Sequence, residues 1–128
     1  MKIYCFGNEF IKQDSLAKKL ADEIKIKGVE LVKADSLEGI NGDIVILDVV
    51  KGIKDVMIID NLEKIKEFHP VSAHDFDIGT ELKLRKAIGD IGKVTIIGIP
   101  MKGNKEEIKE KVKKIIETIS PKQSPKSV

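Results

Sequence analysis

The chain has 128 residues, of which 41% are hydrophobic and 34% are charged. This length is typical of one domain, and the composition excludes an intrinsically disordered chain, a collagen-like repeat and a disulfide-stapled scaffold. The 23 basic and 21 acidic residues leave a net charge of +2, which gives no strong case for a nucleic-acid or membrane partner.

The cysteine content and the N-terminal sequence predict a cellular location. The one cysteine, Cys5, cannot form an internal disulfide, which fits a reducing cytosol. Residues 1–4 lead directly into a strand pattern, so we expect no signal peptide, and no apolar run approaches the ~20 residues of a membrane span. We therefore expect a cytoplasmic protein. Abundant Lys and Glu favour a thermophilic source, although a low-GC genome would produce a similar Lys and Ile bias.

The first elements in chain order are a strand and a helix. Lys2–Phe6 is short and apolar and ends at a glycine, which predicts a buried strand followed by a turn. Apolar residues then recur at helical spacing over residues 16–24, with charged residues between them, which predicts an amphipathic helix. Asp14 and Ser15 are both candidates for the N-cap of this helix.

Three further strand patterns occupy the middle of the chain. Val29–Val32 predicts a second short strand, and Asp43–Val50 is a continuous apolar run typical of a strand buried on both faces. Val56–Ile59 predicts another strand, for which an antiparallel orientation is open. His69–Thr80 reads as a loop because Pro and Gly punctuate it.

The last elements are a helix, a strand and a second helix. Glu81–Ile91 has a helical pattern, Lys93–Ile99 predicts a buried strand, and Lys105–Ile119 predicts an amphipathic helix with Asn104 as its N-cap. Ser120–Val128 has two Ser-Pro pairs and no apolar periodicity, so we expect a disordered tail after a domain of residues 1–119.

Strands that alternate with helices predict the fold class. We expect a three-layer α/β/α domain with a mostly parallel, twisted sheet of about five strands and helices on both faces. In such sheets ligands bind beyond the carboxyl ends of the strands, where the strand order reverses. We therefore expect a functional site among the segments at that edge.

Three polar side chains stand out as candidates, and each also has an ordinary structural reading. Asp48 ends an apolar strand, where an acid must be hydrogen-bonded, paired or metal-bound, or else forms a turn. Asp14 can be a simple N-cap, and His74 can be a solvated loop residue. Their combination is more informative, because two carboxylates and one imidazole suit Ni²⁺, Zn²⁺ or Fe²⁺.

Taken together, these segments resemble the hydrogenase maturation endopeptidases, which trim the C-terminus of the large subunit of nickel-iron hydrogenases. The acidic pair that this family has near its first helix is represented here by Gln13-Asp14. The resemblance covers most of residues 1–119 and is carried by Phe6-Gly7-Asn8, Asp14-Ser15-Leu16-Ala17, Asp43–Asp48, Ser72-Ala73-His74-Asp75-Phe76 and Val94–Pro100.

The resemblance implies a function and a site. It implies that Asp14, Asp48 and His74 are the catalytic and metal-contacting residues, which recognise nickel already inserted in the precursor of the large subunit. Nickel is then supplied by the substrate, and no organic cofactor is expected. One option for cleavage is a carboxylate, with Asp48 as the choice, acting as general base on water while a metal polarises the carbonyl. The resemblance leaves the oligomeric state open, and we favour a monomer.

Two other classes of protein remain as alternatives. A receiver-like signalling domain has a similar length and α/β pattern, with a phosphoacceptor where Asp48 stands and a lysine where Lys102 stands. It does not explain His74, and it needs two adjacent acids after the first strand. A non-enzymatic α/β binding module would use Asp14, Asp48 and His74 only as caps and turns.

Overall fold

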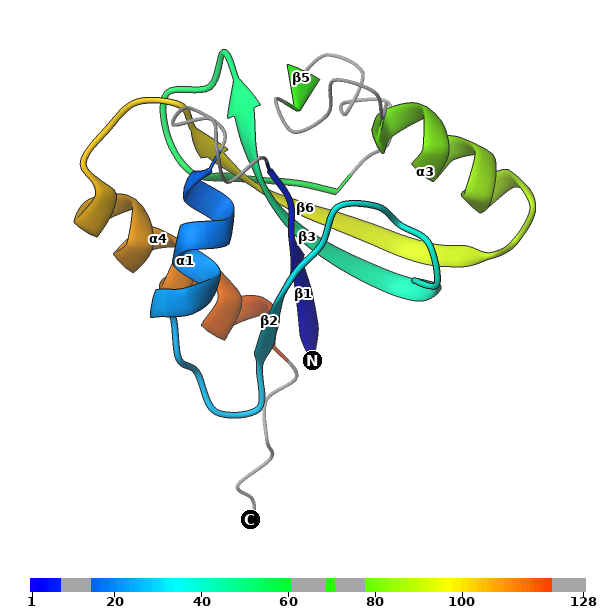
Figure 1. Ribbon diagram of the computed structural model, residues 1–128, viewed down its shortest axis with the longest axis horizontal. Helices are drawn as coiled ribbons and strands as arrows, with labels where there is room; N and C mark the ends of the chain where they lie inside the picture. Colours follow the sequence, from blue (N-terminus) through cyan, green and yellow to red (C-terminus); the bar gives the residue numbers. More distant parts are fainter. Residues whose placement is uncertain (8–14, 61–68, 71–77, 121–128) are drawn as a thin grey trace.

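A computed structural model describes residues 1–7, 15–60, 69–70 and 78–120 of the chain (Figure 1). Strands and helices alternate along it, as the sequence predicts. The elements are β1 (Lys2–Cys5), α1 (Leu16–Glu23), β2 (Glu30–Lys33), β3 (Gly42–Lys51), β4 (Met57–Ile59), β5 (His69–Pro70), α3 (Ile78–Ala87), β6 (Ile91–Pro100) and α4 (Lys105–Ile119).

In the described part of the chain, the strands form one sheet in the order β2-β1-β3-β6-β4, and β5 pairs with the end of β3. The ladders β1–β2, β1–β3 and β3–β6 are parallel, whereas β4 is antiparallel to β6 and β5 is antiparallel to β3. The mostly parallel sheet and the antiparallel option for the fourth strand are both confirmed.

Helices cover both faces of the sheet, which gives three layers. In Figure 1, α1 and α4 lie together on one side of the strands and α3 lies on the other side. Because side chains alternate along a strand, β3 contributes Leu47 and Val49 to the core beneath α1 and α4, and Ile46 and Val50 to the core beneath α3. The three-layer α/β/α fold is therefore confirmed.

The layer of α1 and α4 packs through buried aliphatic side chains. The two helices are also joined by Glu23, which pairs with Lys105 and with Lys109 at 3.5 Å. The hydrogen bond from Lys105 holds the pKa of Glu23 below its usual range. The buried helix residues on this face are Ala17, Leu20, Ala21, Ile108, Val112 and Ile116.

The sequence predicts the limits of α4 correctly but not those of α3. The helix α4 has the predicted limits, and the Asn104 side chain accepts a hydrogen bond from the Glu107 N–H at 3.0 Å. The predicted helix Glu81–Ile91 is instead Ile78–Ala87, and Ile91 is the first residue of β6.

A glycine ends α3 earlier than the spacing of the apolar residues predicts. Gly89 has a φ of 78°, a left-handed conformation that glycine adopts readily. The Asp90 N–H bonds the Arg85 carbonyl and the Gly89 N–H bonds the Lys86 carbonyl, which is the Schellman pattern. This pattern stops the helix, so the apolar residues that follow belong to the next strand.

The C-terminal end of the described domain lies at Ser120, whose N–H bonds the Ile116 carbonyl at 2.8 Å. Ser120 thus caps α4 and does not belong to the predicted tail. The rest of that tail, residues 121–128, lies outside the described residues. No helix in the described ranges is long and apolar enough to cross a bilayer.

Candidate functional site

The strand order reverses between β1 and β3, because β2 lies on one side of β1 and β3 lies on the other. In open α/β sheets, ligands bind outside the carboxyl ends of the strands at this position. The last registered pair of the two strands is Cys5 with Leu47. Asp48 is the next residue of β3, so it lies where β1 ends and where the fold favours a site.

The backbone at this edge is held in place by one hydrogen bond and one glycine. The Phe6 N–H bonds the Leu47 carbonyl at 3.0 Å, which extends the ladder one residue beyond β1. Gly7 follows with a φ of 134°, where a side chain would be strained. The glycine of the Gly7-Asn8 pair therefore has a structural reason: it lets the chain leave the sheet at the candidate site.

Asp48 is almost completely buried, with a relative exposure of 1%. Its carboxylate oxygen accepts a hydrogen bond from the Val49 N–H at 2.9 Å, and its backbone pairs with Gly98 of β6. By alternation its side chain belongs to the face covered by α3. Burial within a strand argues against the turn-forming reading, since a carboxyl group is buried at a large free-energy cost unless it has partners.

Cys5 is registered with Leu47, the residue before Asp48 on the neighbouring strand, and it is fully buried in the core beneath α1 and α4. Burial raises the pKa of the Cys5 thiol to about 12, and the negative charges of Asp48 and Asp22 add to this effect. The thiol is therefore protonated at neutral pH and is not a nucleophile. The interpretation of Cys5 as a core residue agrees with this environment.

The helical pattern of the sequence does not predict that one lysine at this edge, Lys18, is buried. Lys18 follows the charged pattern of the predicted helix, yet its side chain is only 5% exposed and pairs with the exposed Asp35. Asp35 follows β2 in the chain, and the Ala34 N–H bonds the Cys5 carbonyl at 2.9 Å. Lys18 thus places a positive charge near the carboxyl ends of β1 and β2, where it acts to lower the pKa of Cys5.

Two of the three candidate residues, Asp14 and His74, lie outside the described residues. The structure does assign the N-cap of α1 to Ser15, and its carbonyl accepts the Lys19 N–H at 3.0 Å. Ser15 has helical backbone angles and makes no side-chain capping hydrogen bond, so the N-cap reading of Asp14 stays a prediction. Within the described ranges, no group of three or more His, Cys, Asp or Glu side chains is placed to hold a metal ion.

A cavity of about 590 Å³ lies away from this edge. It is at the opposite end of the sheet, where β1, β3 and β6 begin, and Asp48 does not line it. Its size is within the range of small-molecule pockets, but its charged rim is exposed to solvent. Its lining residues are Met1, Lys2, Tyr4, Asp43, Ile44, Val45, Ile58, Asp60, Lys93, Thr95 and Ile119.

Comparisons with known proteins identify the fold. No family model and no curated protein matches the sequence. The structure is similar to the NiFe hydrogenase maturation protease HybD from Thermococcus kodakarensis, with a TM-score of 0.67 and 22% identity over 94% of this chain and 100% of that one. It is also similar to the solution structure of an endopeptidase from Escherichia coli, with a TM-score of 0.63 and 17% identity over 91% and 90% of the two chains. The chain therefore has the fold of these two proteins.

Proposed function

We propose that this protein is an endopeptidase that removes the C-terminal extension of a nickel-iron hydrogenase large-subunit precursor. The proposed substrate signal is nickel already inserted in the precursor, which the protein recognises through Asp14, Asp48 and His74. The observation that carries the proposal is Asp48, a buried acid at the switch point of the sheet.

Two lines of support agree. The sequence motifs resemble the hydrogenase maturation endopeptidases, and the fold is similar to a NiFe hydrogenase maturation protease and to an endopeptidase over more than 90% of this chain. A fold alone does not define an activity, since one fold can support many functions. The buried acid adds a chemical reason for placing a site at the same edge as the motifs.

The three side chains offer suitable chemistry for this role. Two carboxylates and one imidazole are donors that bind first-row transition metals such as nickel. In the proposed reaction, Asp48 accepts a proton from the water that attacks the scissile carbonyl. The peptide C–N bond then breaks, and the leaving amine takes up a proton. Asp14 and His74, together with Asp48, contact the nickel of the substrate and hold the precursor in register.

The sheet topology makes the receiver-like alternative less suitable. Receiver domains share the flavodoxin-like strand order 2-1-3-4-5, in which the strands run parallel. Here the fourth strand of the chain runs antiparallel and lies at the edge beyond β6. The binding-module alternative is separated from the protease by activity, because it predicts that Asp48 can be replaced without consequence.

The test compares wild-type protein with Asp14→Asn, Asp48→Asn and His74→Ala in trimming of nickel-loaded precursor. We expect each variant to lose trimming, because each loses one of the groups that contact nickel or move the proton. Loss of product is followed by the size shift of the precursor on a gel and by mass spectrometry. Far-ultraviolet circular dichroism shows whether each variant keeps its fold.

Two controls sharpen this test. Precursor without nickel should not be trimmed by the wild-type protein, since recognition requires the metal, and efficient trimming of it would contradict the nickel-reading role. The variant Asp43→Asn changes an acid at the amino end of β3, the strand of Asp48, and should trim normally.

Two outcomes would favour the alternative functions. Normal trimming by Asp48→Asn would favour the binding module, and phosphorylation of Asp48 by a small phosphodonor with Mg²⁺ would favour the receiver.

A further inference from the structure

The cavity at the amino ends of β1, β3 and β6 lies where two neighbouring strands separate. The ladder between β1 and β3 begins only at Tyr4, which is registered with Ile46, whereas the ladder between β3 and β6 extends back to Gly42. In the described sheet, the start of β3 therefore pairs with β6 but not with β1. Its unpaired side presents backbone N–H and C=O groups, as the edge of a sheet does. The cavity is lined by Lys2 and Tyr4 of β1 and by residues 43–45 of β3.

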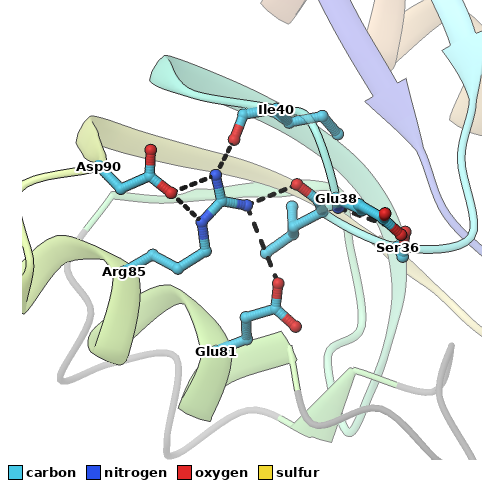
Figure 2. A network of polar contacts seen from close by, with 7 residues as sticks. Ser36, Glu38, Ile40, Glu81, Arg85 and Asp90 are labelled. Atoms are coloured by element: carbon cyan, nitrogen blue, oxygen red, sulfur yellow. Dashed lines mark hydrogen bonds and ion pairs between the residues drawn. The ribbon is translucent and has the colours of Figure 1, made fainter.

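The wall that β3 and β6 form is held in place at the start of both strands. Arg85 pairs at 2.7 Å with Asp90, which directly precedes β6, and donates to the carbonyl of Ile40, which lies two residues before β3 (Figure 2). The Asp43 carboxylate accepts a hydrogen bond from the Lys93 N–H at 2.9 Å, which joins the two strands directly. The wall is therefore fixed before a ligand binds, which limits the conformational entropy lost on binding.

Thr95 is a buried polar residue that lines this cavity. It is only 9% exposed and is registered with Val45, which also lines the cavity. Its hydroxyl makes no hydrogen bond within the part of the chain that the structure describes. Buried hydroxyl groups normally have a partner, because a buried group that loses its hydrogen bonds to water without replacing them destabilises the fold. The Thr95 hydroxyl therefore indicates that a polar group of a bound molecule supplies its partner.

Charged side chains of both signs surround the cavity without neutralising one another. Lys2 and Lys93 are positive, Asp43 and Asp60 are negative, and all four are exposed. Among the described residues, none of the four takes part in an ion pair. The other side chains of the wall are mostly apolar, namely Met1, Ile44, Val45, Ile58 and Ile119. A ligand that matches this wall has an apolar body and carries one charge of each sign.

We propose that the cavity binds a short apolar peptide with free ends. Its volume of about 590 Å³ lies within the ~300–1,000 Å³ of pockets that hold ligands of this size. Lys2 and Lys93 attract the carboxylate of the peptide, and Asp60 attracts its ammonium group. The Thr95 hydroxyl bonds a backbone amide, and the apolar side chains of the peptide contact the aliphatic wall. This site is independent of the proposed function, because Asp48 does not line it.

Isothermal titration calorimetry of the full chain tests this site with the tripeptide Leu-Ala-Leu and its blocked forms. Acetylation of the amino end removes the positive charge of the peptide, and amidation of the carboxyl end removes the negative charge. We expect the free tripeptide to bind, and each singly blocked form to bind about tenfold more weakly, because a charge-assisted hydrogen bond is lost. Free leucine serves as the smaller ligand with the same two charges and should bind more weakly than the tripeptide.

Three variants assign the binding to this cavity. Thr95→Val replaces the hydroxyl by a methyl group, so we expect the affinity for the tripeptide to fall about tenfold while the urea midpoint is unchanged or higher, because an unpartnered buried hydroxyl is removed. Lys93→Gln should weaken binding of the free tripeptide but not of its amidated form, which has no carboxylate. Lys54→Gln changes an exposed lysine outside the cavity and should bind every ligand as wild-type protein does.

Several outcomes would overturn the proposal. Absence of tripeptide binding to wild-type protein, or unchanged affinity in both Thr95→Val and Lys93→Gln, would show that the cavity is not a peptide site. Equal binding of the free and doubly blocked tripeptides would overturn the role of the charges, and equally tight binding of leucine would overturn the peptide class. Lys93→Gln alters an exposed side chain and keeps the test usable if Thr95→Val does not fold. Because the measurement is binding, its result does not depend on whether the protein trims a precursor.

Discussion

At the end of β1, the Cys5 side chain has no exposed surface, and its thiol lies in the electrostatic field of the Asp48 carboxylate. The protonated thiol is a small apolar group that packs with Ile3 and Leu47. Its thiolate would be a buried charge beside another negative charge, which is why its pKa is raised to about 12. Cys5 is therefore not a nucleophile at neutral pH, and its titration makes the stability of the fold depend on pH in the alkaline range.

We expect the stability of the wild-type protein to fall as the pH rises from 9 towards 12. In this window the unfolded thiol has lost its proton while the folded thiol keeps it, so the unfolded state binds fewer protons and gains stability relative to the native state. The slope due to Cys5 is about 1.4 kcal/mol per pH unit. The contribution of Cys5 is the difference between the free energies of unfolding of wild-type and Cys5→Ala protein, measured by urea unfolding between pH 9 and 12.

Other titrating groups do not contribute to the difference between wild-type and Cys5→Ala protein, because both proteins carry them. Parallel curves for the two proteins would contradict the raised pKa. As a second observation, iodoacetamide should modify Cys5 in urea but leave the folded protein unmodified at pH 8, since the thiol is buried and protonated.

Among the elements, α4 shows how local chemistry and packing reinforce each other. Asn104 caps its first turn and Glu106 and Glu107 place negative charge near the positive end of the helix dipole. Three residues, Ile108, Val112 and Ile116, are buried at helical spacing against the sheet. The limits of this helix could be predicted because its cap and its apolar stripe agree.

We expect Asn104→Ala to lower the free energy of unfolding by about 1 kcal/mol, since the Glu107 N–H loses its side-chain acceptor. The effect is measured as a lower urea midpoint with an unchanged m-value. Asn104→Asp keeps an acceptor at the same position and should retain most of the stability. Equal losses in the two variants would contradict this account, because only Asn104→Ala removes the side-chain acceptor.

At the scale of the whole molecule, β3 and β6 form the centre of the fold. They are paired over most of their length and have apolar cores on both faces. The domain closes at Ser120, where the C-cap bond to Ile116 ends α4. The buried residues of both cores lie between Ile3 and Ile116.

Removal of residues 121–128 should consequently change neither stability nor trimming. The sequence of this segment has no apolar periodicity with which to add to either core. Thermal unfolding midpoints and trimming rates of the full chain and of a chain ending at Ser120 provide the measurement. A large loss of either property would show that the removed segment binds to the domain.

The sequence alone was sufficient for the fold class and for most of the elements, but not for β5, which lies in a predicted loop, or for the limits of α3. Apolar runs such as Asp43–Val50 predict buried strands, and the stripe of α4 predicts a surface helix, because the side-chain period of an element is a local property. The sequence also singled out Asp48 from its place at the end of such a run. Asp14 and His74 stay predictions, made from the motifs alone.

Only the tertiary structure decided how distant segments meet. The order β2-β1-β3-β6-β4 places the switch point beside Asp48 and shows that this acid is buried, which no local pattern specifies. Arg85 reads as one more helical cation in the sequence, yet it donates to the Leu37 and Ile40 carbonyls, which lie 48 and 45 residues away. Local periodicity fixes which residues form a strand or a helix, whereas contacts of this separation exist only once the chain has packed.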